Sequence, residues 1–320
     1  MEKISVIIPA LNAENTIGET LSSVLRNQYI SQVILVDNAS TDDTSKIASA
    51  FEDARIEVLL NKQRGIAHSL NVGFKAATSK YIARCDADDL FPPDRTGWQY
   101  DWLENNPEYT AVSAGFSTID SNGAHIANLA CNLVAQDVTE ALLHGKPITH
   151  FGTWLVRRSA IQKVGGARPW FTTAEDVDLQ MRLSETGNIW YEPRIAYNYR
   201  LHDSSITHSL SSSRVEYFDQ MARLFALQRR ANGKDDLQSG REPDKYVVDC
   251  GVKGSKKSNS ALDQSIGFLQ ADAWRNFKRG DYVAAKRCLL NAVRKKPHSY
   301  RLWVNYCTLV VKILYLRIFS

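Results

Sequence analysis

The sequence is poor in the features that mark secreted or membrane-spanning proteins. Its five cysteines are odd in number, widely spaced and never arranged as C-x-x-C, which argues against a disulfide framework and a zinc knuckle. No run of 18 apolar residues is present, so we predict no membrane-spanning helix. The first apolar stretch, Ile4–Ile8, is too short for a signal peptide. We therefore expect a reducing compartment, the cytoplasm.

Two common nucleotide-binding motifs are also missing. Neither G-x-G-x-x-G nor G-x-x-x-x-G-K-[ST] occurs, which removes support for a dinucleotide oxidoreductase or a P-loop ATPase. A nucleotidyltransferase should have a basic, glycine-rich loop after the first strand. The chain has Ala10–Glu14 there, without a glycine or a basic residue. Other groups must hold any bound phosphate.

Charge is distributed unevenly along the 320 residues. From Lys253 onward the chain has fourteen Lys or Arg and three acids, a net charge of +11, whereas the preceding part carries −7. An acidic body is poorly suited to nucleic acid, and we expect none as a partner. The basic end could face anionic lipid, an acidic protein or only solvent.

Short β-branched runs alternate with helical patterns in the first part of the chain. This alternation predicts a doubly wound α/β sheet covered by helices on both faces. The expected strands are 4–8, 33–36, 56–60 and 81–85, and the expected helices are 16–26, 41–51 and 65–77. Because ligands bind beyond the carboxyl ends of such strands, the residues that follow each strand are the candidates for chemistry.

The pattern is mixed in the middle of the chain. We expect strands at 111–116 and 148–156, a turn at 121–123 and a helix at 176–185. The body should then cover residues 1–210, with 1–110 on the nucleotide side and 111–210 on the acceptor side. Residues 211–260 are expected to form a helix and a linker, and residues 261–320 a separate all-helical element.

The C-terminal element has its own periodicity. Between residues 266 and 299, small residues and a Gly-Asp-Tyr turn stand at the spacings of one tetratricopeptide repeat, which this segment resembles. An ordinary helical hairpin is the alternative. Since at least three repeats are normally needed for stability, the element must pack against the body, a partner or a second copy.

An acidic cluster directly follows the strand predicted at 81–85. Asp86 and Asp88 alternate with Ala87 at a strand end, which suits a hard divalent cation such as Mg²⁺ or Mn²⁺ that also binds water and substrate phosphates. Taken alone, an acidic turn of this kind is more often only solvated. Its neighbours in the chain decide between the two interpretations.

Several segments occur in one order that together resemble glycosyltransferase family 2, with its GT-A fold, over about residues 1–210. Each segment is weak alone, but the ordered series is specific. The segments are Ser5–Asn12, Val36–Asp42, Gly65–Ala67, Asn71–Gly73, Asp86–Asp89, Arg157–Ser159, Val164–Gly166, Ala174–Leu179 with Arg182, and Tyr199–His202.

The resemblance implies a nucleotide-sugar site at the start of the chain. Pro9, Ala10 and Asn12 would line a uridine pocket. Asp37 would accept a hydrogen bond from the imide N–H of uracil, and its alternative role is to cap the next helix. The remaining members of the predicted site are Gly65, Asn71, Asp86 and Ala87.

The chain departs from the family at two positions. Asn38 stands where the family often has a second acid, which bears on nucleotide preference. Leu70 stands where the family commonly has arginine, so a phosphate or base contact would come from Arg64 or be missing.

Asp176 is the predicted catalytic base. The resemblance implies direct displacement with inversion, which requires a group that removes the proton of the acceptor hydroxyl. A helix N-terminus favours the ionised carboxylate of Asp176, and the neighbouring Glu175 would orient Asp176 or the acceptor. The alternative is that both are ordinary first-turn acids.

Three further groups carry open interpretations. His202 would join Asp86 and Asp88 as a metal ligand or bind the diphosphate, or it is a surface histidine. His150 is either a core histidine or an acceptor contact. The aromatic side chains that could stack on sugars or simply pack in the core are Trp154, Trp170 and Phe171.

The resulting hypothesis is an inverting, metal-dependent glycosyltransferase. It would move a sugar from a nucleotide-sugar, a UDP-sugar by preference, to a sugar or lipid-linked acceptor hydroxyl in polysaccharide or glycolipid assembly. The alternatives are a nucleotidyltransferase and a non-catalytic scaffold that binds partners through its C-terminal helices. The apolar helix expected over 301–316 would be buried on the preceding repeat, against a second subunit or at the inner membrane surface.

Overall fold

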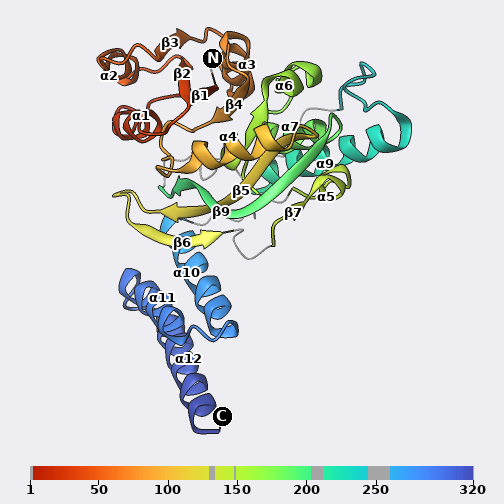
Figure 1. The fold of residues 1–320 in the computed structure, drawn as a ribbon. Helices are drawn as coiled ribbons and strands as arrows, with labels where there is room; N and C mark the ends of the chain where they lie inside the picture. The colour runs from red at the N-terminus through yellow and green to blue at the C-terminus, as the bar shows by residue number, and fades with distance from the viewer. Residues whose placement is uncertain (1–2, 130–133, 148, 203–211, 244–259, 320) are drawn as a thin grey trace, which may run out of the picture. The chain divides into compact units, whose positions relative to one another are not determined.

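The computed structural model describes residues 3–129, 134–147, 149–202, 212–243 and 260–319 (Figure 1). They form two compact units. The first contains the described parts of 1–116, 129–199 and 211–256, and the second those of 117–128, 200–210 and 257–320.

The first unit is built on a mixed sheet with the strand order β3-β2-β1-β4-β8-β5-β9-β7. Its parallel strands are β1 (Ile4–Ala10), β2 (Ile30–Asp37), β3 (Ile56–Leu60) and β4 (Tyr81–Arg84). The later strands are β5 (Tyr109–Ile119), β7 (Gln136–Asp137), β8 (Leu155–Arg157) and β9 (Asn188–Arg200), and β6 (His125–Leu129) pairs with β5. Strand β8 runs antiparallel to β4 and β5. The expected mixed sheet is confirmed.

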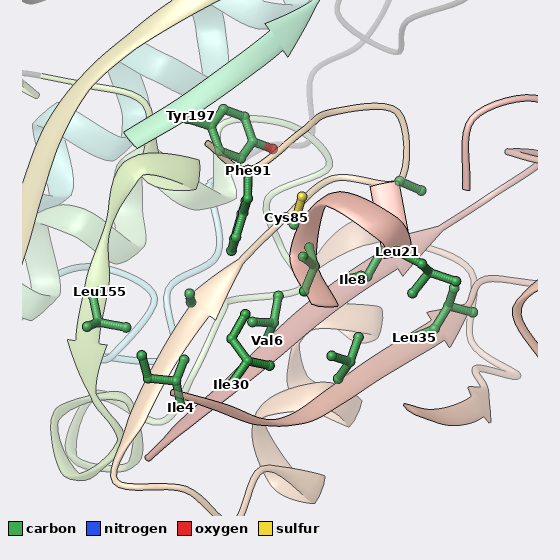
Figure 2. Close-up of a cluster of buried hydrophobic side chains, with 14 of the residues drawn as sticks. Ile4, Val6, Ile8, Leu21, Ile30, Leu35, Cys85, Phe91, Leu155 and Tyr197 are labelled. Carbon is green, nitrogen blue, oxygen red and sulfur yellow. The ribbon is translucent and has the colours of Figure 1, made fainter. Parts of the chain in front are cut away.

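Helices cover both faces of this sheet, as the alternating pattern predicted. Ile4, Val6 and Ile8 of β1 belong to one core, which they share with Leu21 of α1 (Ile17–Leu25) (Figure 2). Helices α2 (Thr44–Ser49) and α4 (Arg95–Asn105) contribute Ala48 and Leu103 to the same core. Ile7 points to the other face. The helices with side chains in that second core are α3 (Ile66–Ala76), α5 (Thr139–Leu143), α6 (Arg158–Val164) and α7 (Glu175–Ser184). Helix α9 (Ser212–Asn232) packs on α7.

The strand predicted at 148–156 is wrong for most of its length. Phe151–Thr153 form a 3₁₀ turn, and the strand begins only at Leu155. The polar side chains before the strand satisfy the backbone locally, because Gly152 N donates to His150 Nδ1 at 3.1 Å. Residue 148 lies outside the described residues.

The second unit contains the helices α10 (Ala261–Lys278), α11 (Tyr282–Lys295) and α12 (Tyr300–Phe319) (Figure 1). The side chains of Ser260 and Asp281 accept hydrogen bonds at the starts of α10 and α11. Small residues such as Ala273 and Ala285 are fully buried where the helices meet. An all-helical element is therefore confirmed, while its assignment as a tetratricopeptide repeat stays a prediction.

Among the described residues, none of the helices combines the length and the apolar character that crossing a bilayer requires. The residues 244–259 of the expected linker lie outside the described part of the chain.

Candidate active site

The acidic turn predicted to hold a cation follows β4 directly. Asp86 and Asp88 are half-buried, whereas Ala87 between them is buried. Two hydroxyl groups at the start of α1 fix the turn: Thr16, which precedes the helix, and Thr20 each donate to the carbonyl oxygen of Ala87 at 2.9 Å. The carboxylates of Asp86 and Asp88 thus project from a backbone that these two hydrogen bonds hold in place.

Arg84, the last residue of β4, joins this turn to Glu175, the neighbour of the predicted base Asp176. Its Nε donates to Asp86 Oδ1 at 2.7 Å and its NH1 donates to Glu175 Oε1 at 3.2 Å. Burial alone lowers the pKa of Arg84, but Asp86, Glu175 and Asp176 outweigh burial and raise that pKa well above its ordinary value. A buried, permanently charged guanidinium therefore lies within a cluster of three carboxylates.

Glu175 and Asp176 begin α7, and they differ in exposure. Ala174 before them has a left-handed backbone with φ of 58°. Glu175 is buried, and burial together with Asp176 and Asp86 raises its pKa to about 7 despite Arg84. Asp176 is half-buried and accepts a hydrogen bond from Val177 N at 2.9 Å. Of the two acids, Asp176 is the one that an acceptor can reach more easily.

Helix α7 is anchored by a buried ionic network behind the site. Asp178 is fully buried and bonds to Arg168 and to Arg182, the latter at 2.8 Å. Arg168 also bonds to the fully buried Asp235 at 2.7 Å. Arg229 of α9 bonds to the same Asp235 at 2.6 Å. The first part of the predicted linker is thus fixed to the helix that presents Asp176.

The predicted uridine side is formed by the ends of β1 and β2. Asp37 is buried and accepts hydrogen bonds from Ser40 N at 2.9 Å and from the Ser45 hydroxyl. Asn12 Oδ1 accepts from Thr41 N at 2.8 Å. Asp37 and Asn12 therefore order the loop after β2. A carboxylate has about four acceptor positions, so Asp37 can accept a further donor.

The other two residues predicted on the nucleotide side belong to α3 and the residue before it. Gly65 precedes the helix with φ of 133°, a conformation that favours glycine. Asn71 exchanges two 2.8 Å hydrogen bonds with the backbone of Ala167. Its amide therefore fixes the loop before α7, and its contact with a nucleotide-sugar stays a prediction. Arg64 is exposed beside Gly65.

His150 lies close to the same carboxylates. Burial lowers its pKa, while Asp86 and Asp176 act in the opposite direction. Its Nδ1 accepts from Gly152 N, so in the neutral ring Nε2 carries the proton. The Tyr197 ring lies 5.2 Å from the His150 ring, and the Tyr197 hydroxyl accepts a hydrogen bond from Asp86 N at 2.9 Å.

The three predicted metal ligands belong to two different units of the structure. Asp86 and Asp88 stand together in the first unit, whereas His202 belongs to the second unit. Over the described ranges, no group of three or more His, Cys, Asp or Glu side chains could hold a metal ion. Two carboxylates nevertheless fit Mg²⁺ or Mn²⁺, because such ions take much of their coordination from water and substrate phosphates.

Of the three aromatic residues that could stack on sugars, two lie in the cores and one lines a cavity. Trp154 and Phe171 are buried in the cores. Trp170 is half-buried and lines a cavity of about 620 Å³ together with Arg214 and Thr172, which lies three residues before Glu175. The indole N–H of Trp170 has no hydrogen-bond partner within the described structure.

Two residues of the site were missed in the sequence. Arg84 had a signal, because an arginine inside a short apolar strand needs a carboxylate partner when it is buried. Tyr197 gave no comparable signal, since its bond to Asp86 depends on the pairing of distant strands.

The order of these elements agrees with a known family. Residues 5–165 match the sequence model of the family described as Glycosyl transferase family 2. The chain belongs to glycosyltransferase family 2. It is thus a nucleotide-sugar-dependent glycosyltransferase, and the nucleotidyltransferase alternative is removed.

Relatives support the family assignment over different lengths. EpsE of Bacillus subtilis (strain 168) is 34% identical over 228 residues, which cover 67% of this chain and 81% of EpsE. The UDP-Glc:α-D-GlcNAc-diphosphoundecaprenol β-1,3-glucosyltransferase WfgD of Escherichia coli is 35% identical over 122 residues, 37% of this chain and 47% of WfgD. The chain thus spans most of one relative and about half of the other.

A solved structure confirms the GT-A fold of this glycosyltransferase. Residues 1–349 of TarS from S. aureus, in complex with UDP-GlcNAc, superpose with a TM-score of 0.57 at 15% identity. The match covers 93% of each chain. At this identity the likeness concerns the fold alone.

Proposed function

We propose that this glycosyltransferase moves a sugar from a UDP-sugar to a hydroxyl group of a sugar or lipid-linked sugar, with inversion at the anomeric carbon. The observation that carries the proposal is the cluster in which Arg84 holds Asp86 and Glu175 beside Asp176. The Arg84 guanidinium therefore links Asp86, on the predicted diphosphate side, to Glu175, the neighbour of the predicted base.

UDP is the proposed donor nucleotide because of the buried carboxylate at the end of β2. Asp37 can accept the imide N–H of uracil, a donor that cytosine lacks. The name of WfgD includes UDP-Glc, and the TarS structure contains UDP-GlcNAc. We extend this nucleotide class, and the assembly of polysaccharides or glycolipids, to the present chain.

Asp176 is the proposed base of a single displacement. Its carboxylate takes the proton of the acceptor hydroxyl, and the oxygen attacks the anomeric carbon from the side opposite the diphosphate. The new glycosidic bond forms as the bond from the anomeric carbon to the phosphate oxygen breaks, and UDP leaves. We place the acceptor sugar toward the cavity beside Trp170, where an aromatic side chain is available for stacking.

Asp86 and Asp88 are the proposed ligands of Mn²⁺ or Mg²⁺. When bound, such an ion neutralises charge on the departing diphosphate. Arg84 would hold Asp86 in the orientation that this role requires, and Glu175 would hold Arg84. The role of His202 in this group stays a prediction.

The test is the release of nucleoside diphosphate from a panel of UDP-, GDP- and dTDP-sugars with Mn²⁺ present. We expect turnover with at least one UDP-sugar and little with the GDP-sugars. Asp37→Asn should reduce this preference, while Asp43→Asn, an exposed acid at the start of α2, should not. Equal use of GDP-sugars would reject the donor assignment, and no turnover with any donor would favour the scaffold alternative.

A further inference from the structure

Helix α12 presents two apolar faces. One face packs within the second unit, where Leu302, Leu309 and Ile313 are buried. The opposite face also consists of apolar side chains. Its members are exposed: Tyr300, Trp303, Val304 at 41%, Cys307, Val311 at 64% and Leu314 at 52%.

The spacing on the exposed face is that of a heptad seam. Positions 300, 304, 307, 311 and 314 follow one another at intervals of four, three, four and three residues. β-branched Val304 and Val311 occupy one class of seam position, and Leu314 occupies the other. This distribution favours pairing of two parallel helices. We name these five residues the α12 seam.

The α12 seam carries no charged residue, and the charged side chains that the structure describes on α12 lie to one side of it. Arg301 and Lys312 fall on one edge, and the Lys312 ammonium lies 5.2 Å from the ring centroid of Trp274 in α10. A helix that lies on an anionic membrane normally has basic residues spread along its polar face. An uncharged seam with heptad spacing instead fits another apolar seam.

We propose that α12 pairs with the α12 of a second copy of this chain, so that the two seams form the core of a two-fold dimer. A seam of two heptads is too short for an independent coiled coil. Here each helix is already ordered by its packing on α11, which reduces the entropy lost on pairing. An interface of this small size is expected to associate in roughly the micromolar range.

Cys307 provides a direct probe because it stands at the centre of the α12 seam. It is seven residues from Tyr300 and seven from Leu314. Parallel pairing brings the two Cys307 side chains to the same level of the seam, and antiparallel pairing about the centre does the same. Cys307 is exposed and free in the single chain.

The first experiment measures the solution mass of the full chain by light scattering between about 1 and 100 µM, the range that brackets the expected association. We expect a rise from one chain toward two. Val311→Glu should keep the mass at one chain throughout, because it places a charge in the seam. Arg301→Glu puts the same residue on the same helix outside the seam and should dimerise like the unmodified chain.

The second experiment does not depend on a seam variant. A mild oxidant should produce a covalent dimer of the unmodified chain, Cys307→Ser should abolish that dimer, and Cys288→Ser should preserve it. A mass of one chain at all concentrations would overturn the proposal. So would cross-linking that persists without Cys307, or a monomer that instead sediments with phosphatidylglycerol vesicles.

Discussion

Arg84 donates a hydrogen bond of 3.2 Å to Glu175, although 91 residues separate the two in the sequence. The same guanidinium bonds to Asp86 at 2.7 Å. The end of β4 and the start of α7 are therefore coupled through one buried cation. In our account the Arg84 guanidinium fixes the position of the donor side of the site relative to the acceptor side.

Replacing Arg84 by lysine should slow the reaction without removing the charge. A lysine ammonium cannot reproduce the fork that reaches both carboxylates. We expect kcat to fall about 10- to 100-fold, as for other residues that orient metal ligands. The Mn²⁺ concentration that gives half-maximal activity should rise. The control is Arg55→Lys, which alters the ion pair with Asp53 before β3. Unchanged kinetics for the Arg84 variant would contradict this role.

Removal of the divalent cation should stop transfer. Excess EDTA, or Asp88→Asn, should abolish UDP release while circular dichroism and thermal unfolding stay close to those of the unmodified protein. Asp94→Asn changes an exposed acid nearby and should retain activity. Full activity in EDTA would show that Asp86 and Asp88 do not act through a metal.

The raised pKa of Glu175 predicts a pH effect on stability. Its carboxyl group holds a proton up to about pH 7 in the folded protein, whereas an unfolded chain releases it near its ordinary value of 4.5. The contribution of Glu175 to the free energy of unfolding should therefore fall as pH rises from 4.5 to 7 and then level off. Denaturant unfolding of the unmodified protein and of Glu175→Gln should show this trend only in the former. Glu52→Gln, at an exposed position, should keep the trend.

The ionic network behind α7 should matter for stability. Asp178→Asn removes the buried carboxylate partner of Arg182, whereas Arg168 loses Asp178 but retains the buried Asp235. We expect the free energy of unfolding to fall by about 3 kcal/mol. Asp43→Asn removes the partner of exposed Lys46 and should leave the free energy of unfolding nearly unchanged. Similar losses for both variants would contradict the assignment of a structural role to Asp178.

Much of the parallel half of the sheet was predictable because its signals are local. The β-branched runs gave strands β1 to β4, and the acidic cluster was correctly expected directly after β4. The helix that presents Glu175 and Asp176 was predicted within one residue at each end. Each of these features is determined by neighbours within a few positions.

The contacts that build the site were not predictable, because they join distant segments. Asp86 meets Tyr197 across 111 residues, and Asn71 meets Ala167 across 96 residues. The strand expected at 148–156 failed for a local reason instead, since His150 accepts a hydrogen bond from Gly152 N, two residues away, where the chain turns. Hydrophobic periodicity contains no information about such polar pairs.

The central claim is that Asp176 removes the proton of the acceptor hydroxyl, and one comparison tests it most directly. UDP binding and turnover are measured for the unmodified enzyme and for Asp176→Asn with the same UDP-sugar, acceptor and Mn²⁺. Our account predicts unchanged UDP affinity and a kcat lower by about 10² to 10⁴. A kcat close to that of the unmodified enzyme would contradict the account and pass the role of base to Glu175.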